Sequence, residues 1–364
     1  MNIFKNIIAA AAFFLAAVCA SAQEKGTVFV DASEFPLFGK AIENTSGRYE
    51  RLPLAYKDVS RESLWSLGRN SAGLYIRFRS NSTVITARWK PKKHHMAHMT
   101  DVGDNGVDLY ILTEKDGWRF AGSGFLWKET EVRTKQLVKD MDPVMREYML
   151  YLPLYTNMES LEIGFDEGSV YEGPAVQSPK SGNPIVMYGS SILQGGCANR
   201  PGMAFTAIIG RKLDREVINL GFSGNAKLDY EIAELMTRVE NPAVFVLDYV
   251  PNSGADLIEE KGETFFRILR DKYPKVPVIF VEDPTYPHSR FDNRMREEVL
   301  SRNAAQKALF KKLKKAGEKK IYYLSTEGMI GDDGEATVDG VHFTDLGMMR
   351  YTDHILPVLK KALR

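Results

Sequence analysis

Five short, nearly continuous apolar runs recur through the second half of this 364-residue chain, with amphipathic stretches between them. Apolar runs of this kind are typical of strands that are covered on both faces. The runs lie at 185–188, 217–221, 243–250, 276–281 and 321–324. The helical patterns lie at 201–213, 229–240, 256–272, 290–316 and 344–363. Regular alternation of strand and helix predicts an α/β fold with a five-stranded, parallel, doubly wound sheet of the flavodoxin-like kind.

The first half of the chain has a different period. Leu74, Ile76 and Phe78 alternate with larger or charged residues, and the runs at 106–112, 147–155 and 161–166 are rich in β-forming residues. Glycine and asparagine clusters separate these runs, so we predict an antiparallel β-sandwich over residues 23–178. The Pro/Gly/Ser-rich segment 171–184 is a plausible linker to an α/β domain at 179–364.

Residues 1–22 have the pattern of a cleaved secretory signal. Lys5 precedes an apolar run from Ile7 to Val18, and a small-residue cleavage site ends at Ala22. The twelve residues of that run cover about 18 Å as a helix, against about 30 Å for a bilayer core. We expect a secreted or periplasmic protein, cleaved after Ala22 and without stable membrane insertion. Lipidation at Cys19 is the less favoured alternative.

Charge and cysteine content exclude several function classes. Lys plus Arg is 48 and Asp plus Glu is 47, so the formal net charge is +1 and gives no field that would attract nucleic acid. The basic run at 311–320 ends a predicted helix, where cations are favourable. After signal removal Cys197 is the remaining cysteine, so no internal disulfide is expected. The sequence carries no signal for an oligomeric state.

Chemically capable residues follow the predicted strands. Ser191 follows the first strand, Gly224 the second and Asn252 the third, and Asp339 and His342 precede the last helix. The carboxyl ends of parallel strands form the ligand-binding edge of such sheets. The three-residue offset allows the Asp339 carboxylate to orient the His342 imidazole. Each feature alone is commonly structural, but together they supply a nucleophile, a base, an orienting acid and oxyanion donors.

These residues resemble the sequence blocks of the SGNH hydrolases, the superfamily of GDSL-like esterases and lipases. The resemblance lies in GSSI at 189–192, SGN at 223–225, Asn252, and the Asp339 and His342 pair, over residues 180–364. Ser190 stands where the family usually has an acidic residue, and Val-Pro-Asn-Ser replaces the usual glycine-rich context of Asn252. GVDLY at 106–110 resembles the GxDLY signature of a β-rich domain. With the segment 189–202, it points to a bacterial subgroup that carries this domain.

The resemblance implies a serine esterase with the triad Ser191, His342 and Asp339. Its oxyanion hole would use the N–H groups of Ser191 and Gly224 and the side-chain amide of Asn252. No metal or organic cofactor is expected. The expected substrate is a small-molecule or glycan ester, with acetyl esters of carbohydrate favoured. The alternatives are a lipase or lysophospholipase with the same triad, and a non-catalytic carbohydrate-binding protein.

Several other residues are candidates for substrate binding or structural roles. Gln194, Arg200 and Asp283 follow predicted strands and could contact substrate, although an ion pair is the commoner role for an arginine such as Arg200. Asp108 of the GVDLY run is expected to be buried and structural. His94, His95 and His98 cluster in KKHHMAHM. The i, i+4 pair His94 and His98 could ligate a metal on a helix, but an exposed loop is favoured, and the loop could also lean over the esterase crevice.

Overall fold

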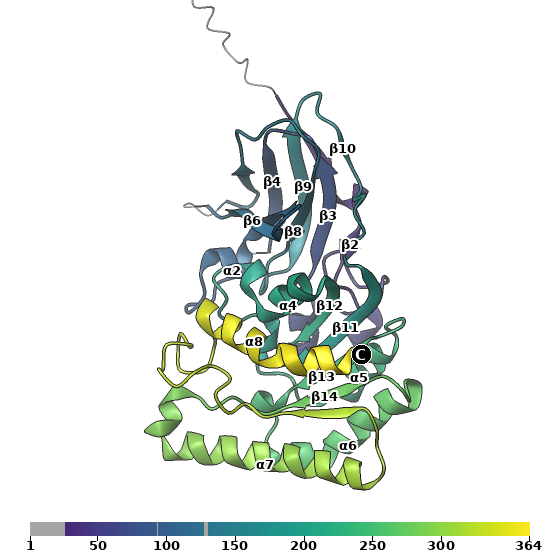
Figure 1. The fold of residues 1–364 in the computed structure, drawn as a ribbon. Coiled ribbons are helices and arrows are strands. Elements are labelled where there is room, and N and C mark those ends of the chain that lie inside the picture. Colours follow the sequence, from purple (N-terminus) through teal and green to yellow (C-terminus); the bar gives the residue numbers. More distant parts are fainter. Residues whose placement is uncertain (1–25, 93, 127–129) are drawn as a thin grey trace, which may run out of the picture.

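The computed structural model describes residues 26–92, 94–126 and 130–364, with a β-rich part stacked on an α/β part (Figure 1). The predicted signal at 1–22 and the alternative lipidation site Cys19 lie outside these residues. Within the described ranges, no helix is both long enough and apolar enough to cross a membrane.

The α/β part is built on one parallel sheet. Its strands are β11 (Ser181–Gly189), β12 (Arg215–Gly221), β13 (Val244–Asp248), β14 (Val278–Val281) and β15 (Ile321–Leu324). They lie in the order β12-β11-β13-β14-β15, with every neighbouring pair parallel. The prediction of a five-stranded, parallel, flavodoxin-like sheet is therefore confirmed, because this is the strand order of that fold.

Helices cover both faces of this sheet. They are α3 (Ser191–Gln194), α4 (Phe205–Leu213), α5 (Tyr230–Thr237), α6 (Ala255–Lys272), α7 (Asn293–Lys315) and α8 (Asp345–Ala362). Val186 and Tyr188 of β11 pack in the core beneath α5, α6 and α7, whereas Ile185 and Met187 pack in the core beneath α4 and α8. Figure 1 shows α7 and α8 on opposite sides of the sheet. Successive residues of the strand are therefore all buried, which explains the unbroken apolar runs.

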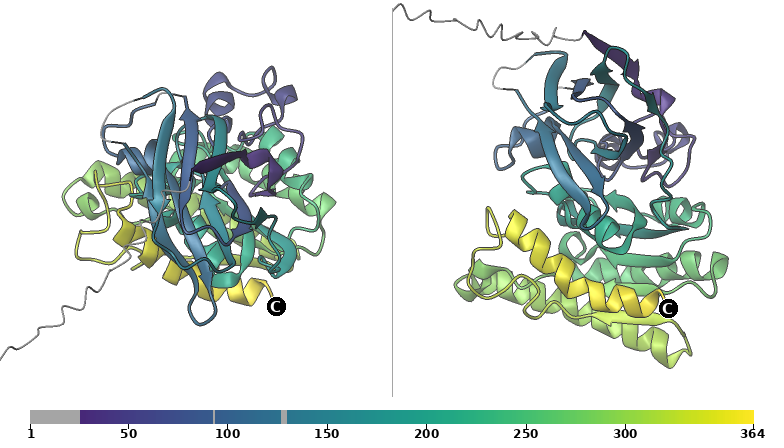
Figure 2. Two further views of the ribbon diagram at one scale, coloured as in Figure 1. Left: turned by 90° about the horizontal axis from the view of Figure 1, so that it is seen from above. Right: turned by 45° about the horizontal axis from the view of Figure 1, so that its top comes forward.

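The β-rich part consists of two antiparallel sheets (Figure 2). One has the order β1 (Thr27–Asp31), β9 (Met158–Asp166), β4 (Ile85–Pro91) and β7 (Arg133–Val138). The other has the order β10 (Tyr171–Glu172), β3 (Tyr75–Ser80), β8 (Arg146–Tyr151), β5 (Val107–Thr113) and β6 (Gly117–Gly124), and β2 (Leu37–Phe38) pairs with β3. Alternating residues predicted to face inward, such as Phe78 and Ile163, fill the core between the sheets.

Short helices complete the fold. They are α1 (Glu62–Gly68) and α2 (Asp101–Asn105), with 3-10 turns η1 (Ala32–Glu34), η2 (Leu54–Tyr56), η3 (Pro201–Met203), η4 (Val250–Asn252) and η5 (Pro287–Arg290). The predicted helix 290–316 begins later, at Asn293, because the Asp292 carboxylate accepts the Met295 N–H at 3.0 Å and caps it.

The outer face of the six-stranded sheet packs on the α/β part. Tyr75, Tyr110 and Tyr151 are buried there against Ala207 of α4. The guanidinium of Arg211, also on α4, lies 4.2 Å from the centre of the Tyr110 ring. These three tyrosines therefore serve the contact between the two parts, whereas residues on the opposite face of the same strands, such as Phe78, fill the sandwich.

Candidate active site

The turn between β11 and α3 presents Ser191 at the carboxyl edge of the parallel sheet. Ser190 caps α3, since its hydroxyl accepts the Ile192 N–H at 3.3 Å. Glycine is required at Gly189 and Gly221, because a Cβ at either position would overlap main-chain atoms of Asp248 or Gln194. The absence of these side chains allows the ends of three strands to approach the nucleophile turn closely.

The loop before α8 brings an imidazole and a carboxylate to the same edge. The Nε2 atom of His342 lies 2.9 Å from the Ser191 hydroxyl oxygen, and its Nδ1 atom lies 2.7 Å from Asp339 Oδ2. Asp339 Oδ1 accepts the main-chain N–H groups of Val341 at 3.0 Å and His342 at 2.8 Å. A continuous hydrogen-bonded chain therefore runs from the carboxylate through the imidazole to the hydroxyl.

The charge of Asp339 fixes the direction of this chain. Burial acts to raise the pKa of Asp339, but hydrogen bonds from the His342 ring and from two main-chain N–H groups outweigh it and lower that pKa to about 2. An ionised carboxylate can only accept a hydrogen bond, so the proton of a neutral imidazole stays on Nδ1. The Nε2 lone pair then faces the Ser191 hydroxyl, as a general base requires.

The loop after β12 and the turn η4 lie beside the nucleophile turn. Gly224 has φ +66°, a left-handed conformation that glycine adopts without strain. Asn252 Oδ1 accepts the Ala226 N–H at 3.3 Å, and over the described ranges the NH₂ group of that amide makes no hydrogen bond. Among the described residues, the N–H groups of Ser191 and Gly224 have no hydrogen-bond partner. These donors are the ones that the sequence predicts for an oxyanion hole.

Comparisons with known proteins identify the family of this chain. The profile of the GDSL-like Lipase/Acylhydrolase family matches residues 182–360, and that of the N-terminus of SGNH-hydrolase-type esterases matches residues 27–171. A GDSL-like lipase from Bacteroides ovatus is 35% identical with a TM-score of 0.88, and the match covers 93% of this chain and 98% of that one. The chain belongs to the SGNH hydrolases. It is therefore a carboxylic ester hydrolase of the GDSL-like group.

More distant solved structures share the fold of this SGNH hydrolase. The salicylyl-acyltransferase SsfX3 of a tetracycline biosynthetic pathway is 16% identical with a TM-score of 0.73, covering 93% of this chain and 99% of that one. A family two carbohydrate esterase from Cellvibrio japonicus is 11% identical with a TM-score of 0.58, covering 93% and 98%. A comparison with curated protein sequences finds no match.

Gln194 does not line the surface of the SGNH site, contrary to the expectation that it contacts substrate. Its side chain is fully buried. Its amide nitrogen donates to Asn70 Oδ1 and to the Leu154 carbonyl, both at 3.1 Å, and its oxygen accepts the Ser223 N–H at 2.9 Å. Gln194 therefore holds the loop that carries Gly224 against the β-rich part, which is a positioning role.

Arg200 and Asp283 are also held by protein groups rather than left free for substrate. Arg200 donates to Asp108 Oδ2 at 2.9 Å and to the Tyr110 hydroxyl at 2.6 Å. Asp283 is fully buried and accepts from the Tyr286 hydroxyl at 2.7 Å and from Arg302 at 3.0 Å. The expectation that Asp283 lines the crevice rim is therefore wrong, because its charge lies below the surface with a cationic partner.

Asp108 is buried and structural, as expected from the sequence. Besides Arg200, it accepts the Gly202 N–H at 2.9 Å. A side chain at Gly202 would overlap the Tyr110 ring. The GVDLY run of the β-rich part thus binds the Arg-Pro-Gly turn that follows the nucleophile, so these two sequence signatures meet in one contact.

The histidine-rich loop leans over the catalytic edge, one of the two loop placements that the sequence suggests. His94 does not pair with His98 as metal ligands on a helix would, because its Nδ1 atom lies 2.7 Å from Asp104 Oδ1 of α2. His95 is exposed. The His98 ring centre lies 5.0 Å from that of His342, and His98 Nε2 lies 4.0 Å from Asp339 Oδ2.

Two further residues near Ser191 have roles that the sequence does not reveal. The Tyr155 hydroxyl, from the segment after β8, donates to the Ser191 carbonyl at 3.1 Å. The aromatic-rich run 147–155 does not indicate that Tyr155 lies beyond the end of β8 and reaches the nucleophile turn. Burial, and then the charge of Asp339, raise the pKa of the Cys197 thiol to about 12. Cys197 is therefore a neutral thiol rather than a competing nucleophile.

Proposed function

We propose that this SGNH hydrolase is an exported serine esterase that removes acyl groups, acetyl in the first place, from carbohydrate hydroxyls. The proposal rests on one observation, the hydrogen-bonded chain from Asp339 through His342 to Ser191 at the carboxyl edge of the parallel sheet. An inert carbohydrate-binding protein would have no chemical need for these hydrogen-bonded catalytic groups. Export is inferred from the signal pattern of residues 1–22.

In the proposed reaction, Ser191 Oγ attacks the ester carbonyl while His342 Nε2 takes its proton. Asp339 stabilises the resulting imidazolium, and the N–H groups of Ser191 and Gly224 and the Asn252 amide stabilise the oxyanion. Collapse of the tetrahedral intermediate transfers the proton from His342 to the departing alcohol and leaves an acyl ester on Ser191. Water, activated by the same imidazole, then releases the acid and restores the serine.

The accessibility of the site favours a substrate that projects an ester from a larger body. The side chains of His342 and Asp339 are 20% and 35% exposed. Carbohydrate is supported by the fold that this chain shares with family two carbohydrate esterases. A preference for longer acyl chains, as expected of a lipase, would be detected by the test below.

Ser191→Ala tests the assignment. We expect normal turnover of p-nitrophenyl acetate and release of acetate from acetylated polysaccharides by the wild-type protein, and a loss of at least about 10⁴-fold in the variant, since triad members act as a unit. A fluorophosphonate should label the wild type and spare the variant. Ser325→Ala is the control, because Ser325 is an exposed serine after β15 at the same edge of the sheet. Undiminished turnover by Ser191→Ala would refute the proposal, and preference for long acyl chains would favour a lipase.

A further inference from the structure

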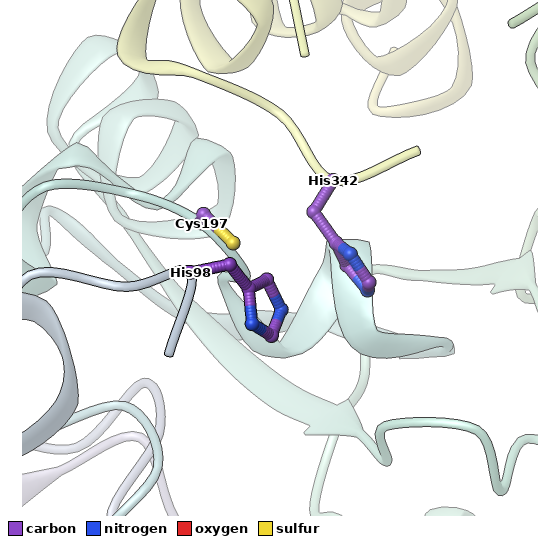
Figure 3. A group of neighbouring side chains, drawn as sticks. All are labelled: His98, Cys197 and His342. Atoms are coloured by element: carbon purple, nitrogen blue, oxygen red, sulfur yellow. The ribbon is translucent and has the colours of Figure 1, made fainter. Parts of the chain in front are cut away.

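Three potential metal ligands from separate segments meet beside the nucleophile. His98 comes from the β-rich part, Cys197 follows α3, and His342 precedes α8; Figure 3 shows the three side chains beside one another. One ligand atom of each residue lies within 4.8 Å of the other two. The main chain ties two of these segments together, because the Cys197 N–H donates to the Phe343 carbonyl at 3.1 Å.

The spacing of these atoms suits a tetrahedral ion after a small closure. Zinc binds imidazole nitrogen at about 2.0–2.1 Å and thiolate sulfur at about 2.3 Å, which places neighbouring ligand atoms about 3.3–3.6 Å apart. Since the ligand atoms lie within 4.8 Å of one another, each separation has to shrink by at most about 1.2–1.5 Å. Rotation of the His98 side chain, which is 31% exposed on a loop, can supply much of that movement.

His98 is available for this purpose. Its Nε2 atom is buried, and within the described part of the chain it has no hydrogen-bond partner. The loop itself is fixed, since the Met96 N–H donates to Asp104 Oδ2 at 3.0 Å and the Thr100 hydroxyl donates to the Asn199 carbonyl at 2.5 Å. A buried nitrogen without a partner is unfavourable, and a bound cation would satisfy it.

A fourth ligand and the local charge both favour a cation. Asp339 Oδ2 lies 4.0 Å from His98 Nε2, and this carboxylate is ionised in the working range of pH. A set of two imidazoles, one thiolate and one carboxylate is typical of zinc and of other thiophilic ions, whereas Mg²⁺ and Ca²⁺ prefer oxygen ligands. On coordination the thiol proton of Cys197 leaves to solvent.

We propose that His98, Cys197 and His342 form a binding site for Zn²⁺ or a similar thiophilic divalent ion, and that the bound ion reversibly inhibits the esterase. Inhibition follows from the two nitrogens of His342. An ion on Nε2 displaces the Ser191 hydroxyl from the general base, and an ion on Nδ1 displaces Asp339. The binding stands independently of the proposed function, whereas the inhibition rests on it.

Zinc titration of the esterase rate is the first measurement. Micromolar Zn²⁺ should inhibit the wild type, and the same concentration of Mg²⁺ should not. Loss of even an outer-sphere partner typically costs about 10–100-fold in metal affinity. We therefore expect the half-inhibiting Zn²⁺ concentration to rise at least about tenfold in Cys197→Ser and His98→Ala, each scored against its own metal-free rate. His95→Ala, an exposed histidine of the same loop, is the matched control and should keep wild-type sensitivity.

Cobalt absorption provides a readout that needs no activity. Co²⁺ should give a thiolate charge-transfer band with the wild type, His95→Ala and Ser191→Ala, and no such band with Cys197→Ser. If the wild type has no esterase activity but Ser191→Ala still gives the cobalt band, the esterase proposal fails and the metal site stands. Two results would overturn the site: no cobalt band in the wild type, or Zn²⁺ inhibition that is equal in Cys197→Ser and the wild type.

Discussion

Replacing Asp339 with asparagine tests the proposed catalytic chain without removing any heavy-atom volume. The asparagine oxygen can keep the two main-chain N–H bonds now made by Oδ1, at 3.0 and 2.8 Å. Its NH₂ group then faces His342 Nδ1, where the carboxylate oxygen stands at 2.7 Å. A donor in that place forces the ring proton to Nε2, so the imidazole would present an N–H, rather than a lone pair, to the Ser191 hydroxyl.

The expected effect combines two losses. The hydrogen bond to the charged carboxylate is worth about 1.5–3 kcal/mol, which corresponds to roughly 10–150-fold in rate at about 1.4 kcal/mol per tenfold. The wrong tautomer adds to this, and the same change in a serine protease triad lowers kcat by about 10⁴-fold. We therefore expect kcat for p-nitrophenyl acetate to fall about 10³–10⁴-fold, with little change in melting temperature, because the two main-chain bonds persist.

Asp333→Asn is the matched control for this variant. Asp333 lies in the same loop region and has a pKa lowered to about 2, chiefly by Arg350, whose two terminal nitrogens bond its carboxylate at 2.8 Å. The charge change is the same, but this ion pair is exposed and does not contact the His342 imidazole. We therefore expect kcat to stay within about twofold and the melting temperature to change little. If Asp339→Asn kept more than a tenth of the wild-type kcat, the role given to Asp339 would be incorrect.

Two further predictions concern buried polar groups. Gln194→Met leaves the Ser223 N–H and the Leu154 carbonyl without their partner, at a cost in stability of about 1–3 kcal/mol each. Denaturant unfolding should show this loss, and kcat should drop more than tenfold with KM little changed. A kcat equal to that of the wild type would refute the positioning role of Gln194. Burial raises the pKa of Asp248 to about 8, so the folded protein holds a proton that the unfolded chain releases near pH 4. Wild-type stability should therefore fall, relative to Asp248→Asn, as pH rises from about 4 to about 8. If the melting temperatures of the two proteins changed equally with pH over that range, the buried Asp248 proton would not be the cause.

The sequence predicts the α/β half well because its signals are local. A parallel strand buried on both faces must be apolar at every position, as Ile185 to Tyr188 are, and each helix shows its own periodicity. The burial of polar residues cannot be predicted in the same way. Gln194 ends the short helix α3 after β11, and Asp283 follows β14, both near the edge of the sheet where ligands bind. Leu154 and Arg302 nevertheless bond to them from distant segments. Their positions in the sequence predict that they lie near the site, but the contacts that bury their side chains come from segments distant in sequence.

The contribution of the β-rich part to the site follows from contacts between the two halves. Asp108 holds the Arg200 side chain and the Gly202 N–H, which fixes the segment after the nucleophile against β5. With that segment fixed, the loop before α2 carries His98 over His342, and Tyr155 bonds the Ser191 carbonyl. A freely tethered glycan-binding module would have no reason to place side chains within bonding distance of the nucleophile turn. The GVDLY and Arg-Pro-Gly signatures occur in one chain, we infer, because their contact fixes the segment after the nucleophile turn against the β-rich part.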